Sequence, residues 1–238
     1  MILPVVRASF GRRHAQHLVH LLGAEDTGLL EGAQRRLEVD GLDAILDDPR
    51  TRNALLTDPR AAAPPDLIAY VLVRQALLEG GVDDRPVADY VTSLLLRFGE
   101  ARQAYRLGDE SDEEFHHLVD IVLRMDQAGS QDRFLLNSHL GNFSLWISGM
   151  FPQFVEARRQ RRGAPPLDYY EKMGAGGFRQ AAESREAAKL GLEPVLQFVS
   201  AHLRSVRIAL NRISDRVFWP SGGNPVNRLL RELEESVS

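Results

Sequence analysis

The stretch FLLNSHLGNFSLWISGMFPQFV, residues 134–155, is the most apolar part of the sequence and predicts the centre of the fold. A membrane span needs about twenty mainly apolar residues, and polar side chains such as Asn137 and Asn142 interrupt this stretch. We therefore expect a buried core helix. Ser144 and Ser148 lie one turn apart on it, so their small side chains allow a neighbouring helix to approach closely.

Apolar residues recur at helical spacing on both sides of this core stretch, and no convincing strict alternation predicts strands. Pro65 and Pro86 each open a strongly apolar helix, because proline is tolerated in the first helical turn. Asp-Pro and Pro-Pro pairs divide the region 40–64 into short helical turns and loops. The other predicted helices span 9–22, 27–39, 111–125, 134–151, 167–189 with a break favoured at 174–177, and 193–217.

These patterns predict an all-α fold, a single-domain multi-helix bundle of roughly eight to ten helices around the central apolar helix. Glycine and proline form a weak joint near 163–166, but the helices on its two sides are interdependent in this interpretation. We therefore expect residues 1–238 to form one helical domain. Residues 219–238 are expected to form a C-terminal tail with a short amphipathic helix.

Composition restricts the classes of function. A formal net charge of -4 gives no overall attraction to nucleic acid or to an anionic membrane. The absence of cysteine excludes disulfides and thiolate metal ligands. The apolar residues 1–6 are too short for the core of a signal peptide, and arginines follow them rather than precede them. We expect a cytoplasmic protein without a transmembrane segment.

Two parts of the sequence resemble a known pattern. The run LGNFSLWISGMFPQF followed by RRGAPPLDYYEKMG, and the run YVLVRQALLEGGVDDRPVAD at 70–89, resemble a family of uncharacterised bacterial all-helical proteins. The resemblance covers about a third of the chain. It implies a helical fold and brings no activity, cofactor or site residue.

Glu113, His117 and Asp120 form the best candidate for a metal site. A Ser-x-x-Glu capping box at Ser111 predicts a helix over 111–125, on which spacings of four and three residues place the three side chains on one face. Carboxylates and imidazoles bind zinc, iron and manganese. The competing explanation is that the acidic residues stabilise the helix N-terminus, while one neighbouring histidine packs inside and the other faces water. We favour this explanation because di-metal bundles need a second Glu-x-x-His element, which the sequence lacks.

The first predicted helix offers His14 and His17 as further metal ligands. Residues three apart on a helix are neighbours, so the pair could share a divalent metal with a carboxylate from another helix. The simpler explanation is that both are ordinary boundary or solvent-facing histidines, and it is the favoured one. A divalent metal is thus a cofactor only in the alternative interpretation.

His139, in the core stretch, is interpreted as a hydrogen-bonded core histidine. A ligand pocket formed by His139, Phe143 and Trp146 is the less favoured explanation. Both explanations require the histidine to lie inside the protein.

The basic run Arg158, Arg159, Arg161 and Arg162 is a candidate anion site, because guanidinium groups bind phosphate and carboxylate in a bidentate manner. The run also lies at a predicted helix C-terminus, where cations complement the helix dipole and Gly163 is placed as the stop. Without interleaved aromatic residues, nucleic-acid binding is the minority interpretation.

No complete catalytic signature is present in the sequence, which lacks the common phosphate-binding, nucleophile-elbow and zinc-protease motifs. The leading hypothesis is a non-enzymatic helical interaction, adaptor or regulatory protein. Its expected partner is another protein or a second copy of the chain. A metal-binding protein or metalloenzyme is the first alternative, and anion or nucleic-acid binding through the arginines is the second.

Overall fold

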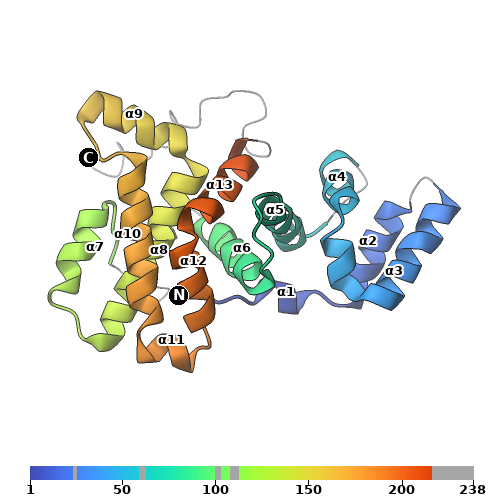
Figure 1. The fold of residues 1–238 in the computed structure, drawn as a ribbon, viewed down its shortest axis with the longest axis horizontal. Helices are drawn as coiled ribbons and strands as arrows, with labels where there is room; N and C mark the ends of the chain where they lie inside the picture. The colour runs from blue at the N-terminus through green and yellow to red at the C-terminus, as the bar shows by residue number, and fades with distance from the viewer. Residues whose placement is uncertain (24–25, 59–62, 100–102, 108–112, 216–238) are drawn as a thin grey trace. The chain divides into compact units, whose positions relative to one another are not determined.

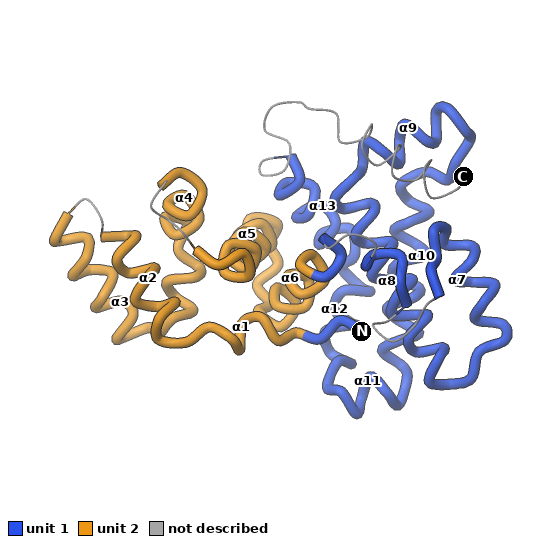
Figure 2. Tube along the Cα trace, turned by 180° about the vertical axis from the view of Figure 1, so that it is seen from behind, with its two compact units in different colours: residues 1–3, 97–238 blue, residues 4–96 orange. Residues whose placement is uncertain are grey.

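The computed structural model describes residues 1–23, 26–58, 63–99, 103–107 and 113–215, and these ranges contain thirteen helices and no strand. The all-α prediction is confirmed. Contacts divide the chain into two compact units, which Figure 2 colours separately: unit 1 is Met1–Leu3 with Arg97–Ser238, and unit 2 is Pro4–Leu96. A compact unit is defined by the contacts among its residues, whereas a domain is defined by its ability to fold by itself. The one-domain expectation therefore stays a prediction.

The helices of unit 2 are α1 (Val6–Ser9), α2 (Arg12–Leu22), α3 (Thr27–Leu46), α4 (Pro49–Thr57), α5 (Pro65–Glu79) and most of α6 (Arg85–Gly99). Within the unit, α2 and α3 pack against each other, and α4 contacts both of them and α5 (Figure 1). Pro65 and Pro86 lie in the first turns of α5 and α6, as predicted. Asp84 accepts a hydrogen bond from the backbone N–H of Val87 at 2.8 Å and so caps α6. Gly41 interrupts α3 with a φ of 80°, which glycine adopts at little cost.

A buried arginine of unit 2 pairs with carboxylates that are nearer the surface, Asp47 and the exposed Asp83. Arg74 on α5 is 1% exposed, and its guanidinium donates two parallel hydrogen bonds to Asp47, at 2.8 and 2.9 Å. It donates a further bond to Asp83. Burial alone would lower the pKa of Arg74, but its bonds to Asp47 and Asp83 outweigh burial and raise it. The charge of Arg74 is therefore neutralised within unit 2.

Unit 1 is built around the predicted core stretch. Its helices are α7 (Leu118–Met125), α8 (Ser130–Met150), α9 (Pro152–Arg162), α10 (Leu167–Ala182), α11 (Arg185–Lys189), α12 (Glu193–Ala201) and α13 (Leu203–Ile213). From Ser138 to Met150 α8 is buried on all sides, and α7, α9, α10, α11 and α13 pack against it. Pro152 starts α9, and Gly163 ends it with a φ of 64°.

Helices α8 and α10 lie side by side in unit 1 and approach closely at small residues (Figure 1). A Cβ atom added to Gly174 would lie 2.9 Å from the Cβ of Ser144, which confirms that Ser144 allows close approach. A Cβ added to Gly177 would lie 2.7 Å from the carbonyl oxygen of Asn137. The predicted break at these glycines is wrong, because their missing side chains serve the packing of a continuous α10.

Several helix boundaries differ from the prediction, and α3 continues to Leu46, beyond the predicted end at residue 39. The break after α10 comes instead at Ser184, whose hydroxyl accepts a hydrogen bond from the N–H of Ala187 at 3.0 Å and caps α11. The predicted helix 193–217 is divided at His202, whose ring stacks on Phe198 with centroids 4.2 Å apart. The predicted helix 9–22 is divided between α1 and α2. With α4, these divisions raise the number of helices above the eight to ten expected.

The region before α7 is also not helical. Phe115 donates a backbone hydrogen bond to the Tyr105 carbonyl at 2.7 Å, and Glu114 pairs with Arg106 as an isolated antiparallel bridge. The helix therefore begins only at Leu118. Ser111, the predicted cap, and the tail 219–238 lie outside the described residues. None of the described helices combines the length and the apolar character needed to cross a membrane.

Candidate functional site

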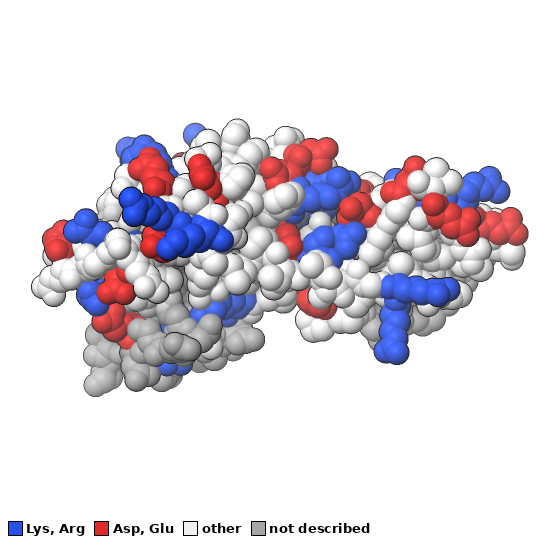
Figure 3. Space-filling view, turned by 90° about the horizontal axis from the view of Figure 1, so that it is seen from below, with Lys and Arg blue, Asp and Glu red and all other residues white. Residues whose placement is uncertain are grey.

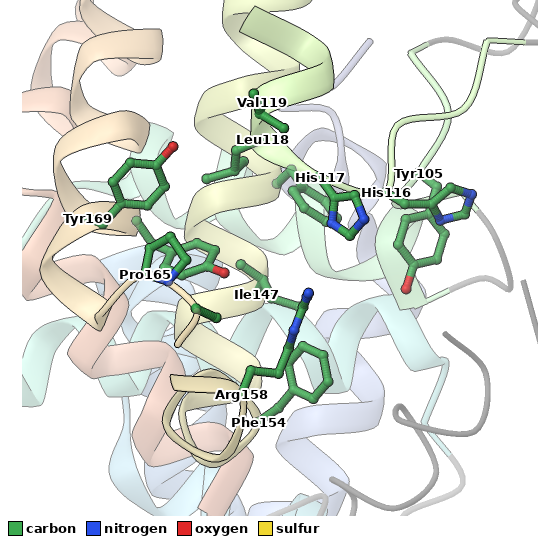
Figure 4. Close-up of a pocket in the computed structure, with 13 residues that line it drawn as sticks. Tyr105, His116, His117, Leu118, Val119, Ile147, Phe154, Arg158, Pro165 and Tyr169 are labelled. Carbon is green, nitrogen blue, oxygen red and sulfur yellow. The ribbon is translucent and has the colours of Figure 1, made fainter. Parts of the chain in front are cut away.

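A pocket of unit 1 lies between α7, α8, α9 and the start of α10, and has a volume of about 210 Å³ (Figure 4). Its walls are mainly apolar and aromatic, with one cationic side chain. They are formed by Tyr105, His116, His117, Leu118, Val119, Phe143, Ile147, Phe154, Arg158, Ala164, Pro165, Tyr169 and Tyr170.

The cationic side chain of the pocket is Arg158, which its helix places one turn after Phe154. The guanidinium carbon of Arg158 lies 5.5 Å from the centre of the Phe154 ring, a cation–π contact. Figure 4 shows the guanidinium turned toward the space between Ile147 and His117. Arg158 is half-buried, and its Nε is buried without a hydrogen-bond partner. The pocket therefore holds a positive charge that the described residues do not neutralise.

Aromatic rings form the opposite ends of the pocket. Tyr105 and His116 have ring centroids 4.7 Å apart at one end, and Tyr169 and Tyr170 meet edge to face at the other. Burial raises the pKa of the Tyr170 hydroxyl, and the nearby charge of Arg158 acts against that rise. The tyrosine is thus neutral at physiological pH and offers a hydroxyl rather than a charge.

The open side of the pocket carries exposed apolar residues of α7. Val119 lines the pocket and is 53% exposed, and Leu123, one turn further along, is 61% exposed. Leu118 and Ile121 on the other side of α7 are buried. Helix α7 therefore carries apolar side chains on two faces. The rest of unit 1 covers only the face with Leu118 and Ile121. We call Val119 and Leu123 the α7 stripe.

The four arginines predicted as one anion site have different surroundings and different partners. Arg158 enters the pocket, whereas Arg159 pairs with Glu156 at 3.5 Å on the exposed side of α9. Arg161 and Arg162 are exposed in the last turn before Gly163. On the face of the described residues in Figure 3, positive and negative side chains are interspersed.

The structure separates the predicted metal ligands. Glu113 precedes α7 and pairs with Arg124 at 3.2 Å, His117 is the extended residue before the helix, and Asp120 is exposed in its first turn. The expectation that they share one helical face is wrong, because residues 113–117 are not helical. Among the described residues, no group of three His, Asp or Glu side chains is placed to hold a metal ion. Metal binding itself stays a prediction.

Of the other histidines singled out in the sequence, the structure places His14 and His17 in a different unit from the predicted metal ligands, and His139 in the core. His14 Nδ1 accepts a hydrogen bond from the N–H of Gly11 at 3.2 Å at the start of α2, and His17 is half-buried on the same helix. Both belong to unit 2, whereas Glu113, His117 and Asp120 belong to unit 1. His139 is buried among Phe98, Phe115 and Phe143, which agrees with a core position. Its Nε2 has no hydrogen-bond partner among the described residues, so the predicted hydrogen bond is not seen at that atom.

Sequence reasoning missed most of the pocket. In the sequence Arg158 stands out only as part of a basic run, although its spacing from Phe154 places both on one side of a helix. Tyr105, Val119 and Tyr169 carry no local signal, because they come together only through the packing of separate helices.

Comparison with known proteins finds no matching family model, no matching curated protein and no matching solved structure. The family resemblance of the two sequence runs therefore stays a prediction. A functional assignment has to rest on the geometry of the site.

Proposed function

We propose that this protein binds a segment of a partner protein in the pocket of unit 1, with the α7 stripe extending the contact. The observation that carries the proposal is the exposed pair Val119 and Leu123 beside an open apolar pocket. It agrees with the leading sequence hypothesis of an interaction protein, which expects an exposed apolar groove.

The size of the pocket favours a partner side chain over a complete small molecule. Pockets that enclose a small molecule commonly have volumes of about 300–1,000 Å³ and bury most of the ligand surface. This pocket has about 210 Å³, and three of its lining residues, His117, Val119 and Pro165, are exposed. A single large apolar side chain, anchored from a chain that continues outside, fits this geometry.

The α7 stripe supplies the additional contact that such a chain needs. Val119 and Leu123 are spaced four residues apart and so lie on the same side of α7. Covering a large apolar side chain contributes on the order of 1.5–3 kcal/mol. Interfaces commonly depend on a few anchors of this kind, surrounded by contacts that exclude water.

The proposal is tested by selecting peptides from a random phage-displayed library against the full-length protein. We expect selected peptides to contain an apolar anchor and to lose binding to Val119→Glu and Leu123→Glu variants. Leu190→Glu is the matched control, because Leu190 is 43% exposed at the end of α11, outside the pocket. Circular dichroism establishes that all three variants are folded.

Two results would overturn the proposal. One is a library selection whose peptides bind the α7 variants as well as the wild type. The other is concentration-dependent self-association in sedimentation that Val119→Glu abolishes, which would identify a second copy of the chain as the occupant.

A further inference from the structure

The charge of Arg158 carries information about the chemistry of the partner. Three other arginines of unit 1 are neutralised internally: Arg124 by Glu113, Arg159 by Glu156 and Arg207 by Glu171. Arg158 has no carboxylate partner among the described residues, and its Nε is buried without any hydrogen bond. Within the described part of unit 1, this is a cation placed toward a pocket and left without a counter-charge.

The surroundings of Arg158 strengthen any interaction with an anion. Phe154, Ile147 and Phe143 line the same pocket, and apolar walls reduce the screening of charge by water. The fork of a guanidinium matches the two oxygens of a carboxylate, and such bidentate charge-assisted bonds are stronger than bonds between neutral groups. A partner that brings an anion here gains affinity that a neutral partner lacks.

The number of cations distinguishes a carboxylate from a phosphate. Sites that recognise phosphorylated segments use clusters of arginines. Arg158 is the one arginine in the pocket wall as described, since Arg159, Arg161 and Arg162 do not line it. A single guanidinium balances the single charge of a carboxylate.

We infer that the partner segment carries a carboxylate close to its apolar anchor, and that this carboxylate pairs with Arg158 while the anchor fills the pocket. The inference rests on the proposed function and goes beyond it by specifying the partner's charge. The carboxylate belongs either to an Asp or Glu side chain or to the C-terminus of the partner chain.

The test is a double-mutant cycle with peptides that depend on Val119, measured by fluorescence anisotropy. Each Asp or Glu beside the anchor is replaced by Asn or Gln, and in a separate arm the C-terminal carboxylate is amidated. We expect the critical replacement and Arg158→Met each to weaken binding about tenfold or more, and the two together to weaken it no further, because both remove the same pair. A loss of affinity on replacement of Asp or Glu would assign the carboxylate to a side chain, and a loss on amidation would assign it to the C-terminus.

Arg159→Met is the control, because Arg159 lies on the same helix but outside the pocket, and we expect it to leave affinity unchanged. Peptides that depend on Val119 but are insensitive to Arg158→Met, or whose losses are additive, would overturn the inference and leave the proposed function intact. Tighter binding when a phosphoserine replaces the acidic residue would overturn it in favour of a phosphorylated partner. Peptides that are insensitive to Val119→Glu would instead contradict the proposed function.

Discussion

Arg74 in unit 2 and Arg158 in unit 1 show two fates of a cation inside a helical protein. Arg74 is almost fully buried, and Asp47 and Asp83 neutralise it through well-formed hydrogen bonds. Arg158 is half-buried against Phe154 and has no carboxylate partner among the described residues. The difference teaches that a buried charge is not in itself a sign of function. A charge that lies in a pocket without a counter-charge, by contrast, can bind an oppositely charged group of a ligand.

The cores of the two units differ in a related way. Unit 2 buries an arginine that pairs with carboxylates nearer its surface, and unit 1 closes its centre through the close approach of α8 and α10 at glycines. We therefore expect the stability of unit 2 to depend most on its ion pair, and the stability of unit 1 to depend on its buried histidine and its glycines.

Replacing Arg74 should destabilise the protein most. Arg74→Met leaves the carboxylate of Asp47, which is 20% exposed, beside an apolar side chain, although Arg85 still pairs with it. We expect the free energy of unfolding to fall by about 3–4 kcal/mol, because the substitution removes two hydrogen bonds between charged groups, Arg74 and Asp47, and such bonds contribute about 1.5–3 kcal/mol each. Urea denaturation followed by circular dichroism measures the loss, and hydrogen exchange locates it in α5.

Arg85→Met is the control for this loss. Its side chain is 45% exposed, so its pair with Asp47 should contribute less than about 1 kcal/mol. If Arg74→Met were as stable as Arg85→Met, the ion pair would not stabilise unit 2 and the comparison would fail.

Acid should destabilise unit 1 through His139. Burial, together with smaller contributions from the charges of Arg97 and the N-terminal amine, lowers the pKa of His139 to about 4. The unfolded chain, with a histidine pKa of about 6.5, binds a proton in the window between pH 6.5 and 4 that the folded chain does not. Stability should therefore fall as the pH is lowered through this window, by about 3 kcal/mol in total and about 2 kcal/mol by pH 5.

Urea denaturation at pH 7 and pH 5, followed by tryptophan fluorescence, measures this effect, because both tryptophans lie outside unit 2. His139→Gln should remove most of the difference between the two pH values. In unit 2, burial raises the pKa of Asp48, but hydrogen bonds and charge from Arg50, with the charge of Arg36, lower it overall. The stability that ionised Asp48 contributes is present above the ordinary pKa of an aspartate and is lost only at a more acidic pH than 5. If α4 lost as much stability at pH 5 as unit 1 does, the assignment of the acid effect to His139 would be contradicted.

Filling the glycine contact of unit 1 should have a smaller effect. A methyl group on Gly177 would lie 2.7 Å from a carbonyl oxygen and 2.9 Å from a backbone nitrogen of α8, so one helix has to move. We expect Gly177→Ala to lower the free energy of unfolding by about 1–3 kcal/mol. Gly176→Ala, which has no atom within 4 Å of the new methyl group, should raise it by up to about 1 kcal/mol. Equal effects in thermal denaturation would show that the glycines do not determine the packing.

Replacing Arg158 should change stability least. Arg158→Met removes a cation–π contact with Phe154 but leaves no carboxylate unpaired, so we expect a change of less than about 1 kcal/mol in either direction. The measurement is the same urea denaturation used for Arg74→Met. A loss as large as that of Arg74→Met would reveal an internal counter-charge for Arg158 and would remove the ground for a carboxylate-bearing partner.

Local signals predicted those parts of the fold that local physics determines. The prolines at 65, 86 and 152 start helices because the fixed φ of proline suits a first turn, and Gly163 ends α9 because it tolerates a positive φ. Gly174 and Gly177 were misinterpreted as a break because their role depends on a second helix, α8, that is not adjacent in sequence.

The sequence by itself determined the all-α class, the buried core helix and the arginine run. Periodicity, caps and composition act over a few residues and can be followed along the chain. Only the tertiary structure decided that Arg158 is the arginine of that run that enters the pocket, that residues 113–117 are not helical, and that Val119 and Leu123 stay exposed. These outcomes depend on which helices pack against one another, because packing decides which side of a helix is covered and which charge finds a partner.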